Sequence, residues 1–178
     1  MAQLPESIAE LVSVPKSLPF RPTWDENSDP YYLTFHIQLI SEARAVGGFE
    51  LRAKVSKQFV DRDAIFQLEY APAGSKGMGL SRCCWRPNNT HTNKRWGPPG
   101  FEFCRFVKTS HQHWFEDNWL PHERRMRNGN LPAARPISPD PSTLSDFIAF
   151  CGEYFKINNI GLVETPTRTA DLFRVSDG

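Results

Sequence analysis

The chain has 178 residues, a length that fits one domain with extended ends. It contains 21 Lys and Arg against 20 Asp and Glu, a formal net charge of +1, which excludes a uniformly basic nucleic-acid coat protein and an acidic tail protein. Aromatic residues make up 12% of the chain, enough large rings to fill a core.

No segment has the features of a membrane span or an export signal. The longest apolar stretch is far shorter than the roughly 20 residues that a membrane helix needs. The first residues lack the basic and apolar regions of a secretory signal. Cys83, Cys84, Cys104 and Cys151 contain no C-x-x-C pair, and Cys83 and Cys84 would point to opposite faces of a strand. We therefore expect a cytoplasmic protein with reduced thiols and no membrane partner.

The chain divides into an N-terminal helix and proline-rich arm (1–30), a single α+β domain (31–163) and a tail (164–178). The first helix is predicted over residues 5–13, and the prolines between residues 14 and 30 predict an extended arm.

Five strands are predicted from apolar residues that recur at every second position. They cover residues 31–40, 49–57, 65–70, 80–86 and 101–108, and an alternative end of the fifth strand is Trp114. The alternation is clearest in the second of them, which indicates a strand with one exposed face. Polar, Pro/Gly-rich stretches over 88–100 and 121–141 predict irregular loops.

The strongest helix signal lies near the C-terminus. An apolar stripe at three- and four-residue steps runs from Leu144 to Phe155, and Asp140 or Ser142 is a candidate cap. Short links between consecutive strands favour antiparallel pairing. We predict an α+β fold: a mostly antiparallel sheet of about five strands packed by this C-terminal helix, with irregular N- and C-terminal arms.

The charge is distributed unevenly along the chain. Residues 82–135 contain ten basic and four acidic residues, a charge of +6, while the remainder has 11 basic and 16 acidic residues, a charge of −5. Four of the five histidines and four of the five tryptophans lie in the same segment. Arg and Lys hold phosphates and aromatic rings stack on bases, so this composition suits a nucleic acid. An Arg-rich solvated loop region would give the same pattern.

The histidines of this segment are the candidate chemical groups. His111 and His113 are two residues apart, so on a strand both imidazoles face the same side. His91 follows the preceding strand, and in a simple long hairpin it would lie about 26 Å from His111, given about 3.3 Å per residue. A site with all three requires the intervening loop to fold back.

Three interpretations of the His-x-His pair stay open. In acid–base cleavage of RNA, His111 and His113 would move the protons of the 2′-hydroxyl and the leaving 5′-oxygen, with His91 as a helper. In the second interpretation, His111 and His113 bind a metal with His91 or a cysteine as third ligand. In the third, the pair is structural and bonds to backbone and loop.

The basic and aromatic residues near the pair are candidate nucleic-acid contacts. They are Arg86, Lys94, Arg95, Arg105, Lys108 and Trp114. Arg86, Arg105 or Lys108 would clamp a phosphate during cleavage, which would then need no metal or other cofactor.

The order of these elements resembles small bacterial and prophage proteins encoded beside toxin–antitoxin genes, the TumE-like toxins. The resemblance covers about residues 49–157. It rests on the strand 66–70, the strand 80–86, His91-Thr92-Asn93, His111-Gln112-His113 and the closing helix 142–155. The chain departs from these toxins in its N-terminal arm, the insertion 94–100, the Arg-rich loop 122–136 and the tail. The resemblance implies a toxin-like or mobile-element role.

Residues and resemblance together lead to one function and two alternatives. The first is an RNA-directed protein of a toxin–antitoxin or phage–host conflict system, in the form of a metal-independent endoribonuclease that uses the His pair. RNA is expected in preference to DNA, and a protein partner is compatible with this role. The alternatives are a non-enzymatic binding or inhibitor module that uses the same basic, Trp-rich face, and a metal-dependent enzyme.

Overall fold

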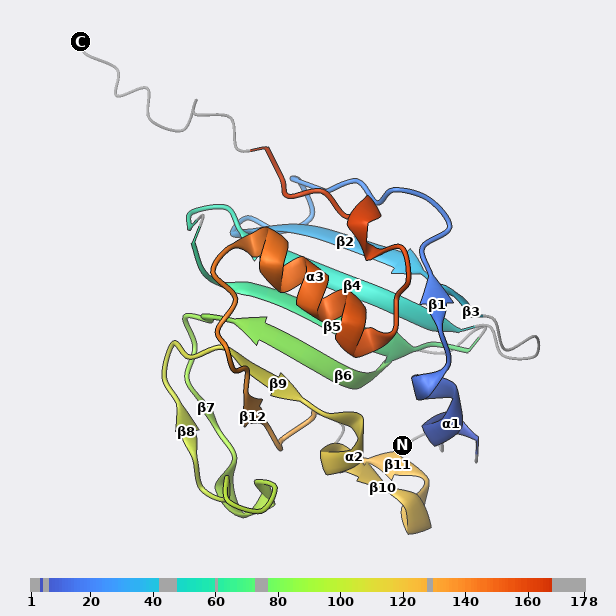
Figure 1. Cartoon of the computed structure of the whole chain (residues 1–178), viewed down its shortest axis with the longest axis vertical. Coiled ribbons are helices and arrows are strands. Elements are labelled where there is room, and N and C mark those ends of the chain that lie inside the picture. The colour runs from blue at the N-terminus through green and yellow to red at the C-terminus, as the bar shows by residue number, and fades with distance from the viewer. Residues whose placement is uncertain are drawn as a thin grey trace.

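A computed structural model describes residue 4 and residues 7–41, 48–59, 61–72, 77–127 and 130–167. Its centre is a six-stranded sheet in the order β12-β9-β6-β5-β4-β2, in which every neighbouring pair is antiparallel (Figure 1). The strands are β2 (Tyr32–Gln38), β4 (Phe49–Ser56), β5 (Ala64–Tyr70), β6 (Met78–Trp85), β9 (His111–His113) and β12 (Arg135–Pro136). The predicted α+β fold is confirmed.

The helix α3 (Leu144–Phe155) covers one face of this sheet (Figure 1). Its apolar stripe supplies Phe147, which stacks on Trp85 and meets Phe66 edge-on, at centroid distances of 6.0 and 5.6 Å. Burial of these rings is the main attraction between helix and sheet.

The cap of α3 differs from the prediction. Thr143, rather than Asp140 or Ser142, accepts from the Asp146 amide, and Asp146 accepts from the Thr143 amide, which completes a capping box. Asp140 instead forms an ion pair with Arg86 at 2.7 Å.

The N-terminal segment lies against the sheet. The helix α1 spans Ile8–Ser13, while residues 5 and 6 of the predicted helix lie outside the described residues. β1 (Lys16–Ser17) pairs with β3 (Ile40–Ser41), and the Trp24 ring meets the Phe35 ring at 4.7 Å. The proline-rich stretch between residues 14 and 30 contains bends and is held beside the sheet by these contacts.

The predicted fifth strand over 101–108 is wrong. Only β8 (Arg105–Phe106) is extended there, and it pairs with β7 (His91–Thr92) in a separate two-stranded hairpin that also holds the 3-10 turn η1 (Lys94–Trp96). Phe103 and Lys108 have φ angles of 59° and 52°, in the left-handed region, so a continuous strand is impossible. β9 takes the predicted place beside β6.

Short elements complete the described chain. They are α2 (Phe115–Asn118), β10 (Trp119–Leu120), η2 (Pro121–Glu123), β11 (Arg125–Met126) and η4 (Ile160–Leu162). The start of the tail is tied down, because Trp24 Nε1 donates to the Glu164 carbonyl, and residues 168–178 lie outside the described part. Within the described ranges, no helix has the length and apolar character to cross a bilayer.

Candidate functional site

The two histidines of β9 lie on the sheet face opposite α3. β9 pairs with β6 so that His111 is in register with Cys84 and His113 with Arg82. Cys83, one residue before Cys84, packs in the core under α3 beside Cys151. The expectations that His111 and His113 share one side, and that Cys83 and Cys84 face opposite sides, agree with this register.

His91 joins this pair from the β7–β8 hairpin. Its ring centroid lies 5.3 Å from that of His111 and 4.7 Å from that of His113. The separation of about 26 Å deduced from a simple hairpin is wrong, because β7 and β8 fold back over the end of β9. Phe106 of β8 stacks on His111 at 5.2 Å and covers it.

The three imidazoles differ in exposure. His111 and His113 are 2% and 1% exposed, whereas His91 is half-buried. Burial lowers the pKa of His111 to about 4 and that of His113 well below its usual value, and it also lowers the pKa of His91. All three rings are therefore neutral at pH 7, and the two inner rings have almost no surface through which to meet a phosphodiester. The acid–base interpretation stays a prediction, and this burial weighs against it.

The hydrogen bonds of the inner pair use one nitrogen of each ring. His111 Nδ1 lies 2.8 Å from the Thr109 carbonyl oxygen and His113 Nδ1 lies 2.6 Å from that of Leu131. A carbonyl only accepts, so each Nδ1 carries the proton and each Nε2 has a free lone pair. Burial raises the pKa of the adjacent Cys84 thiol to about 12. The ligand atoms of Cys84, His111 and His113 lie within 4.8 Å of one another, which is the arrangement that the metal interpretation requires.

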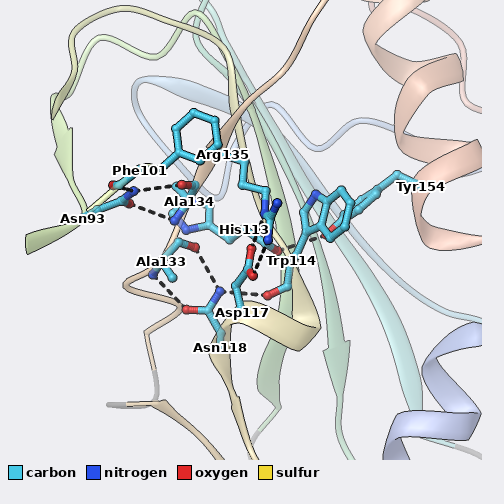
Figure 2. Close-up of polar contacts among 10 residues, drawn as sticks. All are labelled: Asn93, Phe101, His113, Trp114, Asp117, Asn118, Ala133, Ala134, Arg135 and Tyr154. Atoms are coloured by element: carbon cyan, nitrogen blue, oxygen red, sulfur yellow. Dashed lines mark hydrogen bonds and ion pairs between the residues drawn. The ribbon is translucent and has the colours of Figure 1, made fainter. Parts of the chain in front are cut away.

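Two buried asparagines, Asn93 and Asn118, hold the segment of Ala133 and Ala134 near His113 (Figure 2). Asn93 donates to the Ala134 carbonyl at 2.9 Å and accepts from the Ala134 amide at 2.8 Å. Asn118 makes the same pair with Ala133, both at 2.9 Å. Each asparagine side chain thus makes the two backbone hydrogen bonds that a neighbouring strand would otherwise make to that alanine. Residue type alone does not distinguish such asparagines from turn asparagines, so sequence reasoning missed them.

Four of the predicted nucleic-acid contacts lie on one segment of the chain. Lys94, Arg95, Arg105 and Lys108 are exposed on the β7–β8 hairpin and its continuation, residues 91–108, which we call the basic arm. No ion-pair partner for any of the four occurs in the part of the chain that the structure describes.

The other two predicted contacts lie elsewhere. Arg86 binds Asp140 and the Pro141 carbonyl, at 2.7 and 3.1 Å, and so holds the entry to α3. Trp114 lies between Arg135 and Tyr154 on the helix side of β9 (Figure 2), with centroid distances of 4.7 and 6.3 Å. Neither side chain joins the surface of the basic arm.

The open face of the sheet also carries a groove of about 920 Å³. Its lining includes Arg52, Lys54 and Arg82 from the sheet and Phe20 and Asp25 from the N-terminal segment. Sequence reasoning missed this groove, because the path of the proline-rich stretch over the sheet is a tertiary feature. Comparison with known proteins adds no relative: no family model, curated protein or solved structure matches the chain.

Proposed function

We propose that this protein binds nucleic acid, RNA in preference to DNA, through the basic arm. The observation that carries the proposal is the group of four exposed cations, Lys94, Arg95, Arg105 and Lys108, on one projecting hairpin. Phosphate groups of a nucleic acid neutralise such a group and release its counterions.

Aromatic side chains accompany these cations. The Phe103 side chain is 70% exposed at the end of the arm, and Trp96 lies beneath Arg95, with 4.2 Å between guanidinium carbon and ring centroid. The Trp96 ring is partly buried and also contacts the Arg127 guanidinium, at 4.6 Å, so the exposed ring of the arm is that of Phe103. An exposed ring beside cations is the combination that stacks unpaired bases, which favours single-stranded RNA.

Cations elsewhere on the surface contrast with the arm. Arg21, Arg62 and Arg125 each form an ion pair with a neighbouring carboxylate at 2.5–3.1 Å. A cation whose charge is already balanced gains less from a phosphate, so these residues serve as matched controls for the arm.

Fluorescence anisotropy with a labelled single-stranded RNA, at a series of salt concentrations, tests the proposal. Each lost phosphate contact lowers the slope of log K against log salt by about 0.7 for a single strand. We expect Arg105→Ala with Lys108→Ala to lower the slope by about 1.4, and Arg21→Ala with Arg62→Ala to leave it unchanged. An equal effect of the two double variants, or no RNA binding by the wild type, would refute the proposal. DNA of the same sequence tests the preference for RNA.

Cleavage of the bound RNA is a second candidate function, favoured by the convergence of three imidazoles at the base of the arm. In this version the 2′-oxygen attacks phosphorus, the 5′-oxygen leaves, and the histidines move the two protons. His113→Ala and His91→Ala should then abolish cleavage and leave RNA affinity within a few-fold, since such groups contribute about 10²–10⁴ in rate. Cleavage that survives both changes would rule out the histidine mechanism, and a wild type that does not cleave RNA would leave binding as the function.

The biological setting that fits an RNA-directed protein of this size is a toxin–antitoxin or phage–host conflict system. Expression in a bacterial host should then arrest growth, and the arm variant Arg105→Ala with Lys108→Ala should relieve the arrest. Unimpaired growth on expression of the wild-type protein without a neutralising partner contradicts this role.

A further inference from the structure

We propose that Cys84, His111 and His113 form a Zn²⁺ site. The three residues come from two paired strands, β6 and β9, and share the face opposite α3. Their ligand atoms lie within 4.8 Å of one another, and all three residues are buried. The proposal does not depend on nucleic-acid binding, but it excludes metal-independent cleavage by these histidines, because zinc would occupy the Nε2 atoms that proton transfer needs.

Hydrogen bonds leave one nitrogen of each imidazole available to a metal. Because His111 Nδ1 and His113 Nδ1 donate to the carbonyls of Thr109 and Leu131, the lone pair of each Nε2 is left for a ligand bond. A histidine that binds a metal in proteins nearly always donates its other N–H in this manner.

The types of donor select the metal. One sulfur and two imidazole nitrogens suit Zn²⁺ and exclude Mg²⁺ and Ca²⁺, which take oxygen ligands. Around a tetrahedral zinc ion, bonds of about 2.0–2.1 Å to nitrogen and 2.3 Å to sulfur place one sulfur and two nitrogens about 3.3–3.6 Å apart. The ligand atoms now lie within 4.8 Å of one another, so they would have to approach by about 1 Å to reach this spacing.

The fourth coordination position is left to a small ligand. His91 is the next imidazole, but its Nε2 is already in a hydrogen bond to Asn93 Oδ1 at 3.1 Å. Arg82 is in register with His113 and adds a positive charge beside the site. Three protein ligands with an open position are the pattern of catalytic zinc sites, and the neighbouring cation favours water-derived hydroxide or another anion there.

A second group of donors on the same sheet face provides a control. His36, Glu50 and Glu69 also lie within 4.8 Å of one another. His36 Nε2 is 2.7 Å from Glu50, and Arg52 binds Glu69 at 3.0 Å, so these donors are already paired with protein groups. The group is also partly exposed, and we expect it to bind zinc weakly.

Metal content and Co²⁺ absorption test the site in the full chain. After chelator treatment and dialysis against Zn²⁺, the wild type should hold one zinc per chain, and its Co²⁺ form should show thiolate-to-metal charge-transfer absorption. Cys84→Ala should abolish this absorption and weaken zinc binding at least tenfold. Cys104→Ala and His36→Gln, at a thiol and an imidazole outside the site, should change neither property.

X-ray absorption of the zinc form keeps the test decisive where Cys84→Ala does not fold. The wild-type spectrum should contain one sulfur and at least two imidazole nitrogens around zinc. Three results would each overturn the proposal: the wild type does not bind zinc, its zinc has only nitrogen and oxygen ligands, or folded Cys84→Ala binds zinc with full affinity.

Discussion

Replacement of Asn118 by alanine should destabilise the protein more than its small volume change suggests. The amide of Asn118 donates to the carbonyls of Trp114 and Ala133, at 2.8 and 2.9 Å, and accepts from the Ala133 amide at 2.9 Å. Ala133 is fully buried, so water cannot replace the lost partner without entering the core. The substitution therefore leaves at least two buried backbone groups of Ala133 without hydrogen bonds.

The magnitude follows from the cost of such groups. Each buried, unpaired backbone group costs about 1–3 kcal/mol, so for two groups we expect a loss of about 2–6 kcal/mol in the free energy of unfolding. For a chain of this size the melting temperature falls by about 2–4 °C per kcal/mol, and the expected decrease is roughly 4–24 °C. Urea unfolding followed by circular dichroism measures the free energy of unfolding, and calorimetry measures the melting temperature.

Two other asparagines provide a graded comparison. Asn159 makes the same paired contact with the Leu18 amide and carbonyl, at 2.8 and 2.9 Å, but it is only half-buried, and water can replace part of it. Asn158 is exposed. We expect the loss of stability on change to alanine to decrease from Asn118 to Asn159 to Asn158. Equal losses for Asn118→Ala and Asn158→Ala would show that burial of the amide pair does not stabilise the fold.

Three further changes test the packing, capping and charge of the fold. Gly152→Ala places a Cβ 2.2 Å from Ile160 Cγ2, so we expect a loss of about 1–3 kcal/mol in urea unfolding, and no loss would mean that η4 shifts freely. Thr143→Ala removes the capping box with Asp146 and should cost about 1 kcal/mol in the same assay; an unchanged midpoint contradicts a role for the cap. Burial, with a smaller effect of a nearby lysine, lowers the pKa of Lys16 from 10.5 to about 8, so the unfolded chain binds more protons between these values. Stability should therefore rise from pH 8 to 10.5, by up to about 3 kcal/mol, relative to Lys16→Met, and parallel pH curves for the two proteins would contradict this cause.

The central sheet and its helix were predictable because their signals are local. In β4 the apolar residues Leu51, Ala53 and Val55 alternate with polar ones, and the structure buries these three under α3. The stripe from Leu144 to Phe155 likewise has the helical period. Burial of one face imposes a regular spacing of apolar residues on any strand or helix, so this spacing is visible in the sequence without knowing which element packs against that face.

The candidate site could be predicted only in part, because its geometry depends on contacts between distant residues. His111 and His113 are two residues apart in one strand, and this spacing alone predicts that both side chains face the same side of the sheet. The return of His91 depends on left-handed backbone at Phe103 and Lys108, residue types that do not favour it, and on the bonds from Asn93 to Ala134, 41 positions away. Cys84 becomes a candidate ligand only through the register of β6 with β9, which the wrong strand over 101–108 concealed.

The asparagine contacts and the proposed zinc site share one segment, which makes a further prediction possible. His113 Nδ1 donates to Leu131, and Ala133, two residues later, is held by Asn118. Asn118→Ala should loosen this segment and with it the orientation of His113 Nε2. Loss of such outer hydrogen bonds typically weakens metal binding about 10–100-fold. Competition with a chelator should therefore show weaker zinc binding by Asn118→Ala, whereas Asn159→Ala, whose amide holds Leu18 instead, should bind zinc as the wild type does. Equal weakening in both variants would mean that general loss of stability, and not the support of His113, determines the affinity.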